Sequence, residues 1–244
     1  MEKFSLYDLL GLLLPGVLFV YFCNVLNSLF GVFTLFDTSI GWNFDIGILL
    51  CFALIAGAML YAINFWLITK RWYNWLFGMK KHVAELYLEL NVPHLPMNET
   101  LNRKAKEWYG NNIFFSKEEL KHRGTQMTEQ EKNLQDELYD RMYYELQYLD
   151  KIDSAKTLQS FYYFFRQTVT ACLLLLILFI ILTFFGLVKG TSIPPNKADY
   201  IIWIPILLLL TTILSARHAQ WYRKSMVLKM YWAYFTHLNQ PLNK

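Results

Sequence analysis

The sequence predicts an all-α membrane protein in which four transmembrane helices carry a helical, coiled-coil-like cytoplasmic domain that is continuous with the third span. Three observations support this fold class. Of the 244 residues, 55% are hydrophobic, a fraction that is typical of membrane proteins. The apolar residues gather in four runs that polar segments separate. Finally, neither glycine nor proline occurs between Gly124 and Gly186, so an uninterrupted helix is expected there.

The first two apolar runs predict a transmembrane hairpin within residues 1–69, with spans at about 6–30 and 46–69. The Pro15-Gly16 pair is expected to kink the first span, because proline cannot donate a helical hydrogen bond. The loop 31–45 contains two aspartates and no lysine or arginine. Aromatic residues that suit the membrane interface follow the second span: Trp72, Tyr73 and Trp75.

The stretch 125–185 is expected to form one helix, which rises from the cytoplasm as a stalk and then enters the membrane. Thr128 and Glu131 form the S/T-x-x-E capping box that starts such a helix. Apolar residues then recur in steps of three and four, close to a heptad repeat: Leu134, Leu138, Met142, Leu146, Leu149, Ile152, Ala155 and Leu158. Because a stalk cannot bury this stripe alone, self-association through it is expected. The alternative is two helices with a break near Ser160.

Residues 70–165 form the predicted cytoplasmic domain, and shorter segments precede its long helix. A helix is expected to extend the second span to residue 90, and the segment 91–112, which contains two prolines, is expected to be looser. A short helix is expected at 116–122, where Ser116 and Glu119 form another capping box.

The last two apolar runs predict a second hairpin within residues 166–216, with spans at about 168–188 and 200–215. The fourth span is short and contains Pro205. The basic tail 217–244 is expected to extend this span as a helix in the cytoplasm and to pack beside the stalk.

Positive charge predicts the orientation of the spans. The loop 31–45 contains no lysine or arginine, and the loop 189–199 contains two, whereas the tail and the region 70–166 hold all the others except Lys3. The positive-inside rule therefore places both termini and the large middle region in the cytoplasm. The region 70–166 itself is nearly neutral, with 15 basic and 14 acidic side chains.

The sequence contains none of the common catalytic or metal-binding motifs. It has no G-x-S-x-G, P-loop, H-E-x-x-H or C-x-x-C pattern. The five histidines are scattered, without a partner at ligand spacing, and the three cysteines fall in apolar runs, as reduced packing residues do. No enzymatic activity and no cofactor or metal is therefore expected.

Amide side chains inside the predicted spans are the first candidate site. Asn24 and Asn27 are three residues apart and share a face of the first span, and Asn64 lies deep in the second. Such side chains could line a water path. The alternative is hydrogen bonding between helices, which is common in membrane bundles.

A basic segment with interleaved aromatic residues is the second candidate site. Its cations are Arg103, Lys104, Lys106, Lys117, Lys121 and Arg123, and Trp108 is among its aromatic residues. Cations beside exposed rings suit single-stranded nucleic acid, since phosphates pair with the charges and bases stack on the rings. The alternative is a solvated face over a small aromatic core, because Glu107, Glu118 and Glu119 lie in the same segment.

The start of the chain resembles that of small bacterial membrane proteins from anti-phage defence loci. The residues that carry the resemblance are Tyr7-Asp8-Leu9-Leu10-Gly11 and Leu14-Pro15-Gly16. With four spans and a helical insert between the second and third, the chain resembles the membrane effectors of the Hailong system. A second resemblance is to the four-span membrane subunit of the Kiwa system.

The resemblance to Hailong effectors implies a channel in the bacterial inner membrane, assembled as a homotetramer. Its cytoplasmic part would hold short single-stranded DNA oligomers from a partner nucleotidyltransferase, which keep it shut until infection removes them. The open channel would then depolarise the cell. The resemblance to Kiwa implies instead a membrane sensor that recruits a soluble effector.

Two functional hypotheses follow. The first is a homo-oligomeric ion channel gated by its cytoplasmic helical domain, with the long helix as the transmitter. The second is a membrane-anchored sensor or scaffold without a conducting path, in which residues 103–123 are a protein docking site. An intramembrane enzyme is a distant third.

Overall fold

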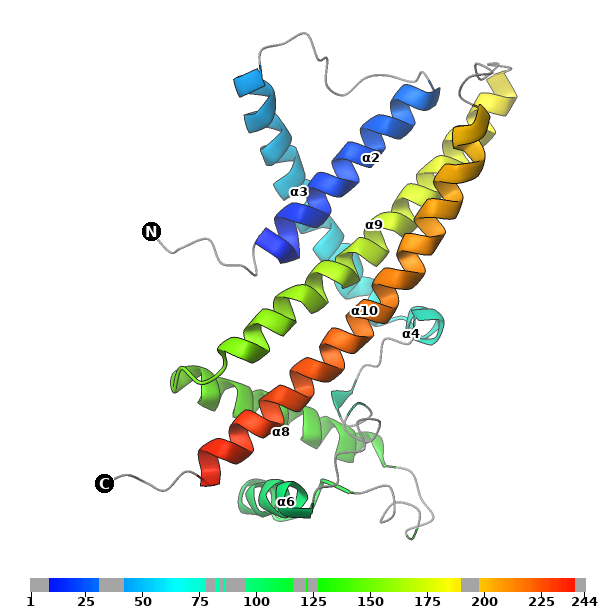
Figure 1. Cartoon of the computed structure of the whole chain (residues 1–244). Helices are drawn as coiled ribbons and strands as arrows, with labels where there is room; N and C mark the ends of the chain where they lie inside the picture. Colours follow the sequence, from blue (N-terminus) through cyan, green and yellow to red (C-terminus); the bar gives the residue numbers. More distant parts are fainter. Residues whose placement is uncertain are drawn as a thin grey trace. The chain divides into compact units, whose positions relative to one another are not determined.

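The computed structural model describes residues 9–30, 42–77, 82–83, 86, 95–115, 122, 127–189 and 198–239. These residues form helices and connecting turns and contain no strand (Figure 1). The elements are the π-helical turn η1 (Leu9–Leu13) and the α-helices α2 (Leu14–Phe30), α3 (Trp42–Ile68), α4 (Arg71–Phe77), α6 (Leu95–Tyr109), α8 (Glu129–Tyr148), α9 (Asp153–Lys189) and α10 (Ala198–Asn239).

Three of the described helices are long and apolar enough to cross a membrane. They comprise Gly47–Ile68, Asp153–Gly186 and Ile201–Asn239, and they contain most of the second, third and fourth predicted spans. The first predicted span corresponds to a shorter apolar helix, Leu10–Leu26, so its crossing of the membrane stays a prediction. The fold is therefore all-helical, with at least three segments suited to a bilayer.

The chain divides into two compact units. The span unit consists of Met1–Met79 with Ser160–Gln220, and the helical unit consists of Lys80–Gln159 with Trp221–Lys244. The backbone of α9 belongs to the helical unit up to Gln159, and that of α10 belongs to it from Trp221. Each of these two boundaries lies inside a helix, and neither helix is interrupted there.

Two glycines allow α2 and α3 of the span unit to cross at backbone distance. A Cβ atom on Gly16 would collide with the carbonyl oxygen of Ala53, and one on Gly57 would collide with the carbonyl oxygen of Leu12. Ala53 and Gly57 are four residues apart, so they form the small-xxx-small pattern that permits close helix packing in membranes. Pro15 stands in the first turn of α2, directly after the π-helical turn, so the helical geometry changes next to the Pro15-Gly16 pair.

A second group of contacts in the span unit joins α2 to the last two helices. Leu26, Phe179 and Leu208 are buried together with Cys172 and Leu175. In this unit α9 and α10 lie side by side (Figure 1). The short helix α4 buries Tyr73 and exposes Trp72 and Trp75, which is the arrangement expected of an aromatic anchor at the membrane interface.

The helical unit is built around a core that α6, α8, the start of α9 and the end of α10 share. Leu138, Met142 and Leu146 of α8 are completely buried in this core, and so are Met230 and Tyr234 of α10. The Tyr231 ring lies edge-on to Phe114 and Tyr139, at 5.8 Å from each. The tail continues α10 as a helix as far as Asn239, and its buried side chains share the core with those of α8.

The predicted single helix over 125–185 is wrong, because the chain turns between α8 and α9. Leu149 caps α8, Asp150 adopts a left-handed φ of 55°, and Lys151 N donates to Leu146 O at 2.9 Å. Aspartate tolerates this conformation better than most residues. The break therefore lies about ten residues before Ser160, where the alternative had placed it, and Ser160 itself is inside α9.

The turn changes the role of the apolar stripe. Leu138, Met142, Leu146, Ile152 and Ala155 all enter the core of the helical unit, together with side chains of α6 and α10 of the same chain. The stripe is thus covered within one copy rather than along a coiled-coil seam. The stripe therefore does not by itself require self-association, and the capping box of Thr128 and Glu131 is present as predicted.

Two shorter segments also differ from the predictions. The chain leaves helical geometry at Thr69–Lys70, so α4 is separate from α3 rather than its extension. The segment predicted to be looser contains the helix α6, with Pro96 in its first turn and Gly110 directly after its end, positions at which these residues favour helix boundaries. Of the short helix predicted at 116–122, only His122 lies within the described residues.

Candidate functional site

The three asparagines predicted to line a path lie in different settings. Asn24 is partly buried on α2, and the side chain of Asn27 lies outside the described residues. Asn64 is completely buried on α3. Of the three asparagines, Asn64 is therefore the one whose side chain lies in the interior of the span unit.

Asn64 is the centre of a hydrogen-bond network that links α3, α4 and α9. Its Nδ2 donates to Thr170 Oγ1 at 2.5 Å and to the Arg166 carbonyl oxygen at 3.0 Å, and it lies 3.4 Å from the Tyr73 hydroxyl. This geometry favours the interpretation of Asn64 as a link between helices over that of a pore-lining side chain.

Replacement of Asn64 by alanine is expected to lower the stability of the span unit by about 1–3 kcal/mol, because buried partners on α4 and α9 lose their donor. The thermal unfolding midpoint of the detergent-solubilised protein measures this. Asn24→Ala, at a partly buried position, serves as the control. An unchanged midpoint for Asn64→Ala, together with altered ion flux, would restore Asn64 to the pore.

The network adjoins a buried cation that the sequence prediction missed. Arg166 is 6% exposed, and its guanidinium lies 4.6 Å and 5.2 Å from the ring centres of Tyr163 and Tyr162. In the part of the chain that the structure describes, its Nε has no hydrogen-bond partner, and neither amide atom of the adjacent, fully buried Gln167 has one. Ionisable side chains within apolar helices are costly and mark functional positions.

Arg166 was missed because it stands at the edge of the apolar run, where it resembled a residue of the cytoplasmic flank. The signal in the sequence was the pair of tyrosines three and four residues before it. Residues at that spacing share a helix face, so the rings can cover the guanidinium and shield it from solvent.

The basic segment is only partly described. Arg103, Lys104 and Lys106 lie on α6, whereas Lys117, Lys121 and Arg123 fall outside the described residues. Lys104 pairs with Glu107 at 2.9 Å, and Arg103 and Lys106 are exposed. The described cations thus form a solvated face that carries acids as well as bases.

Trp108 is engaged within the chain. The Arg141 guanidinium lies 5.4 Å from its ring centre and 5.3 Å from that of Tyr109, and the same guanidinium pairs with Glu137 at 2.7 Å. Phe114, in the same segment, is completely buried. A stacking surface for bases would have to displace Arg141, so this part of the segment favours the structural interpretation.

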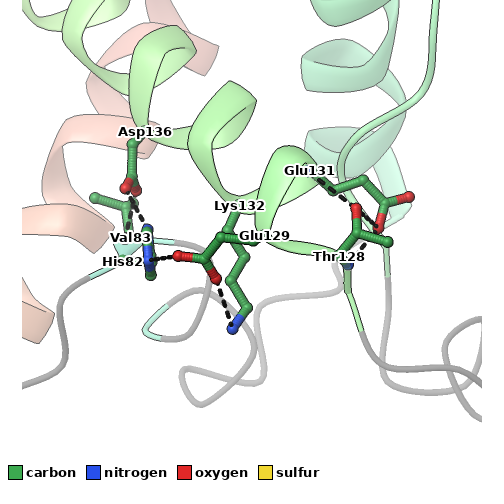
Figure 2. A network of polar contacts seen from close by, with 7 residues as sticks. All are labelled: His82, Val83, Thr128, Glu129, Glu131, Lys132 and Asp136. Atoms are coloured by element: carbon green, nitrogen blue, oxygen red, sulfur yellow. Dashed lines mark hydrogen bonds and ion pairs between the residues drawn. The ribbon is translucent and has the colours of Figure 1, made fainter. Parts of the chain in front are cut away.

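A third cluster joins residues that the sequence keeps far apart (Figure 2). The buried ring of His82 has its Nδ1 2.7 Å from Asp136 Oδ2 and its Nε2 3.0 Å from Glu129 Oε1. The Val83 amide donates to Asp136 Oδ1 at 2.7 Å, and Lys132 Nζ lies 3.9 Å from Glu129 Oε2. Sequence spacing gave no sign of this cluster, because His82 is about fifty residues from both carboxylates.

No protein-family model matches the chain, and neither the curated proteins nor the solved structures contain a significant match. The resemblance to membrane proteins of defence systems therefore remains an expectation from the sequence, and function has to be argued from the geometry.

Proposed function

We propose that the chain forms a homo-oligomeric ion channel in the bacterial inner membrane, gated by its helical unit and acting in defence against phage. The observation that carries the proposal is the set of buried polar groups in the span unit. Arg166 Nε and both amide atoms of Gln167 are buried at the edge of the apolar part of α9, and no described protein group bonds to them. Such groups are stable in a membrane when they adjoin a hydrated path.

Two helices support the coupling of the path to the helical unit. The helix α9, which carries Arg166, begins at Asp153 among core residues of the helical unit, and α10 continues from its apolar part into the same core. A rearrangement of that core changes the ends of both helices directly. The single long helix predicted as the transmitter is thus replaced by two helices that share one core.

The core of the helical unit also supports the proposed topology. Since α6 and α8 share it with the C-terminal part of α10, residues 80–159 and the tail lie on one side of a membrane. Positive charge makes that side the cytoplasm. The 5 residues of η1 and the 17 of α2 rise about 33 Å together, enough to cross the bilayer core and return the N-terminus to the cytoplasm.

The gating ligand is proposed from the resemblance: short single-stranded DNA oligomers made by a partner nucleotidyltransferase, bound by a homotetramer. The exposed cations Arg103 and Lys106 of α6 would contribute to binding through phosphates. In an oligomer these charges repeat around the axis, which raises the local positive potential.

The second candidate function is a membrane sensor that conducts no ions and recruits a soluble effector. The observation that favours it is the pair of hydrogen bonds that the buried Asn64 amide nitrogen donates to α9. In this case the exposed face of α6 is a protein docking site.

The experiment that separates the two functions is ion flux through proteoliposomes containing wild-type protein or the double variant Asn24→Leu with Asn27→Leu. A channel lined by these amides is expected to lose most of its flux, because leucine dewets the path. Cys51→Leu, at an exposed position of α3, is the matched control. Absence of flux from folded, oligomeric wild-type protein would favour the sensor.

A further inference from the structure

We propose that His82 is a proton-binding latch: its doubly protonated ring attaches this residue and the neighbouring Val83 to α8, and loss of one proton releases them. The latch stands on the geometry of the cluster alone. Only its effect on gating rests on the proposed function.

The two contacts of the ring match the two donors of its charged form. Both ring nitrogens lie within hydrogen-bond distance of carboxylate oxygens, at 2.7 Å and 3.0 Å. A neutral imidazole has one N–H donor and one acceptor, whereas an imidazolium has two donors. With a neutral ring, one nitrogen lone pair would face a carboxylate oxygen at a distance where only a hydrogen bond is favourable.

The second proton belongs to the ring rather than to either acid. Asp136 accepts from the Val83 amide through its other oxygen, and the other oxygen of Glu129 faces Lys132 (Figure 2). Each carboxylate therefore receives donors or cations on both sides, which favours its ionised form. The carboxylates hold opposite nitrogens of the ring, so the cluster does not converge on one point as metal ligands do.

Because the His82 ring is buried, its charge has to be compensated by groups within the protein. His82 is 4% exposed, while the side chains of Glu129 and Asp136 are 63% and 32% exposed. A buried imidazolium is stable only while its charge is compensated, and Asp136 and Glu129 of α8 supply carboxylates to the ring, although Glu129 also faces Lys132. Asp140 lies one turn after Asp136 on α8, where burial and the charge of Asp136 raise its pKa.

The latch fastens a segment that connects the two units in the sequence. Val83 and Leu86, the described residues beside His82, are both buried in the core of the helical unit. When the pH rises and the ring loses one proton, one of its two hydrogen bonds becomes a repulsive contact, which weakens the attachment of His82, and of Val83 beside it, to α8. The stabilisation is therefore present at lower pH and is lost as the pH rises.

The test uses the full chain in nanodiscs with ¹⁵N-labelled histidine. Ring nitrogen spectra distinguish imidazolium from neutral tautomers, and His82→Gln identifies the signal of His82. We expect two protonated nitrogens for His82 in the folded protein. A neutral His82 ring in the wild-type protein under these conditions would overturn the proposal.

The second readout is protection of the Val83 amide from hydrogen exchange, corrected for the intrinsic effect of pH. Protection is expected to fall roughly tenfold or more as the ring is deprotonated, which corresponds to the loss of one hydrogen bond to a charged group. Glu129→Gln, at an exposed side chain, should weaken this pH dependence without unfolding the core, whereas His122→Gln, at an exposed histidine, should leave it unchanged. An identical pH dependence in Glu129→Gln and wild type would contradict the latch.

These readouts do not depend on conduction. If the ring is charged and Val83 loses protection on deprotonation, the latch stands even where proteoliposomes show no flux. If flux is present and responds to pH in the wild type but not in Glu129→Gln, the latch also regulates the proposed channel.

Discussion

Alanine in place of Gly16 or Gly57 is expected to separate α2 from α3 and to abolish correct folding of the span unit. The added methyl group would meet a backbone carbonyl, at Ala53 for Gly16 and at Leu12 for Gly57. Backbone cannot move aside as a flexible side chain can, so the cost is about 3 kcal/mol or more, at the upper end of overpacking in cores. The yield of monodisperse protein in detergent and its thermal unfolding midpoint measure the effect.

The chain supplies matched controls for this prediction. A Cβ atom on Gly47, also in α3, has nothing within 4 Å, and one on Gly11 meets only the Tyr163 side chain, at 3.8 Å. Gly47→Ala and Gly11→Ala should therefore leave the midpoint nearly unchanged. Equal behaviour of all four variants would show that α2 and α3 do not cross at these glycines.

Proline in place of Trp221 is expected to uncouple the helical unit from ion flux while the protein remains in the membrane. Trp221 is the first residue of α10 in the helical unit, and 58% of it is exposed. Proline removes one helical hydrogen bond and clashes with the carbonyl of residue 217, at a cost of about 3 kcal/mol. Ion flux through proteoliposomes should then no longer change when nuclease removes DNA oligomers bound to the helical unit.

Trp221→Ala is the control for the loss of the indole ring, and it should keep the response of the wild type. Leu146→Pro has a different expected result. Leu146 lies in α8 and is buried in the core, so proline there should unfold the helical unit rather than break a transmitter. A full response in Trp221→Pro would mean that α10 does not transmit the change.

Apolar periodicity predicted much of the fold. The runs at 46–69, 168–188 and 200–215 coincide with helices suited to a bilayer, because a helix in lipid needs about 20 apolar residues and little else. The capping box at Thr128 was correct, since it depends on residues only three apart. Local patterns of this kind do not depend on the rest of the fold.

The break between α8 and α9 could not be predicted from such patterns. The apolar stripe continues through it, and neither glycine nor proline marks it. The turn rests on one aspartate, Asp150, in a left-handed conformation, and it lets both sides of the break face one core. The heptad-like stripe therefore predicted correctly that its side chains are buried. It predicted their packing partner wrongly, because the side chains that cover the stripe come from α6 and α10 of the same chain.

The candidate sites depend on contacts between residues distant in the sequence. Asn64 and Thr170 meet at 2.5 Å across 106 positions, and His82 and Asp136 meet at 2.7 Å across 54. A single sequence holds no signal for such pairs. Composition could identify the amides and histidines as polar residues of interest, but only packing decides which of them become linked.

We propose that this chain conducts ions under the control of its helical unit, and single-channel recording of purified protein in a planar bilayer, before and after nuclease treatment, can show whether it does. Discrete currents are expected to appear or grow after nuclease, as bound DNA oligomers are removed. Currents unaffected by nuclease would retain the channel and reject the DNA ligand, whereas silence in both conditions, from protein shown to be folded and oligomeric, would rule out the proposed channel.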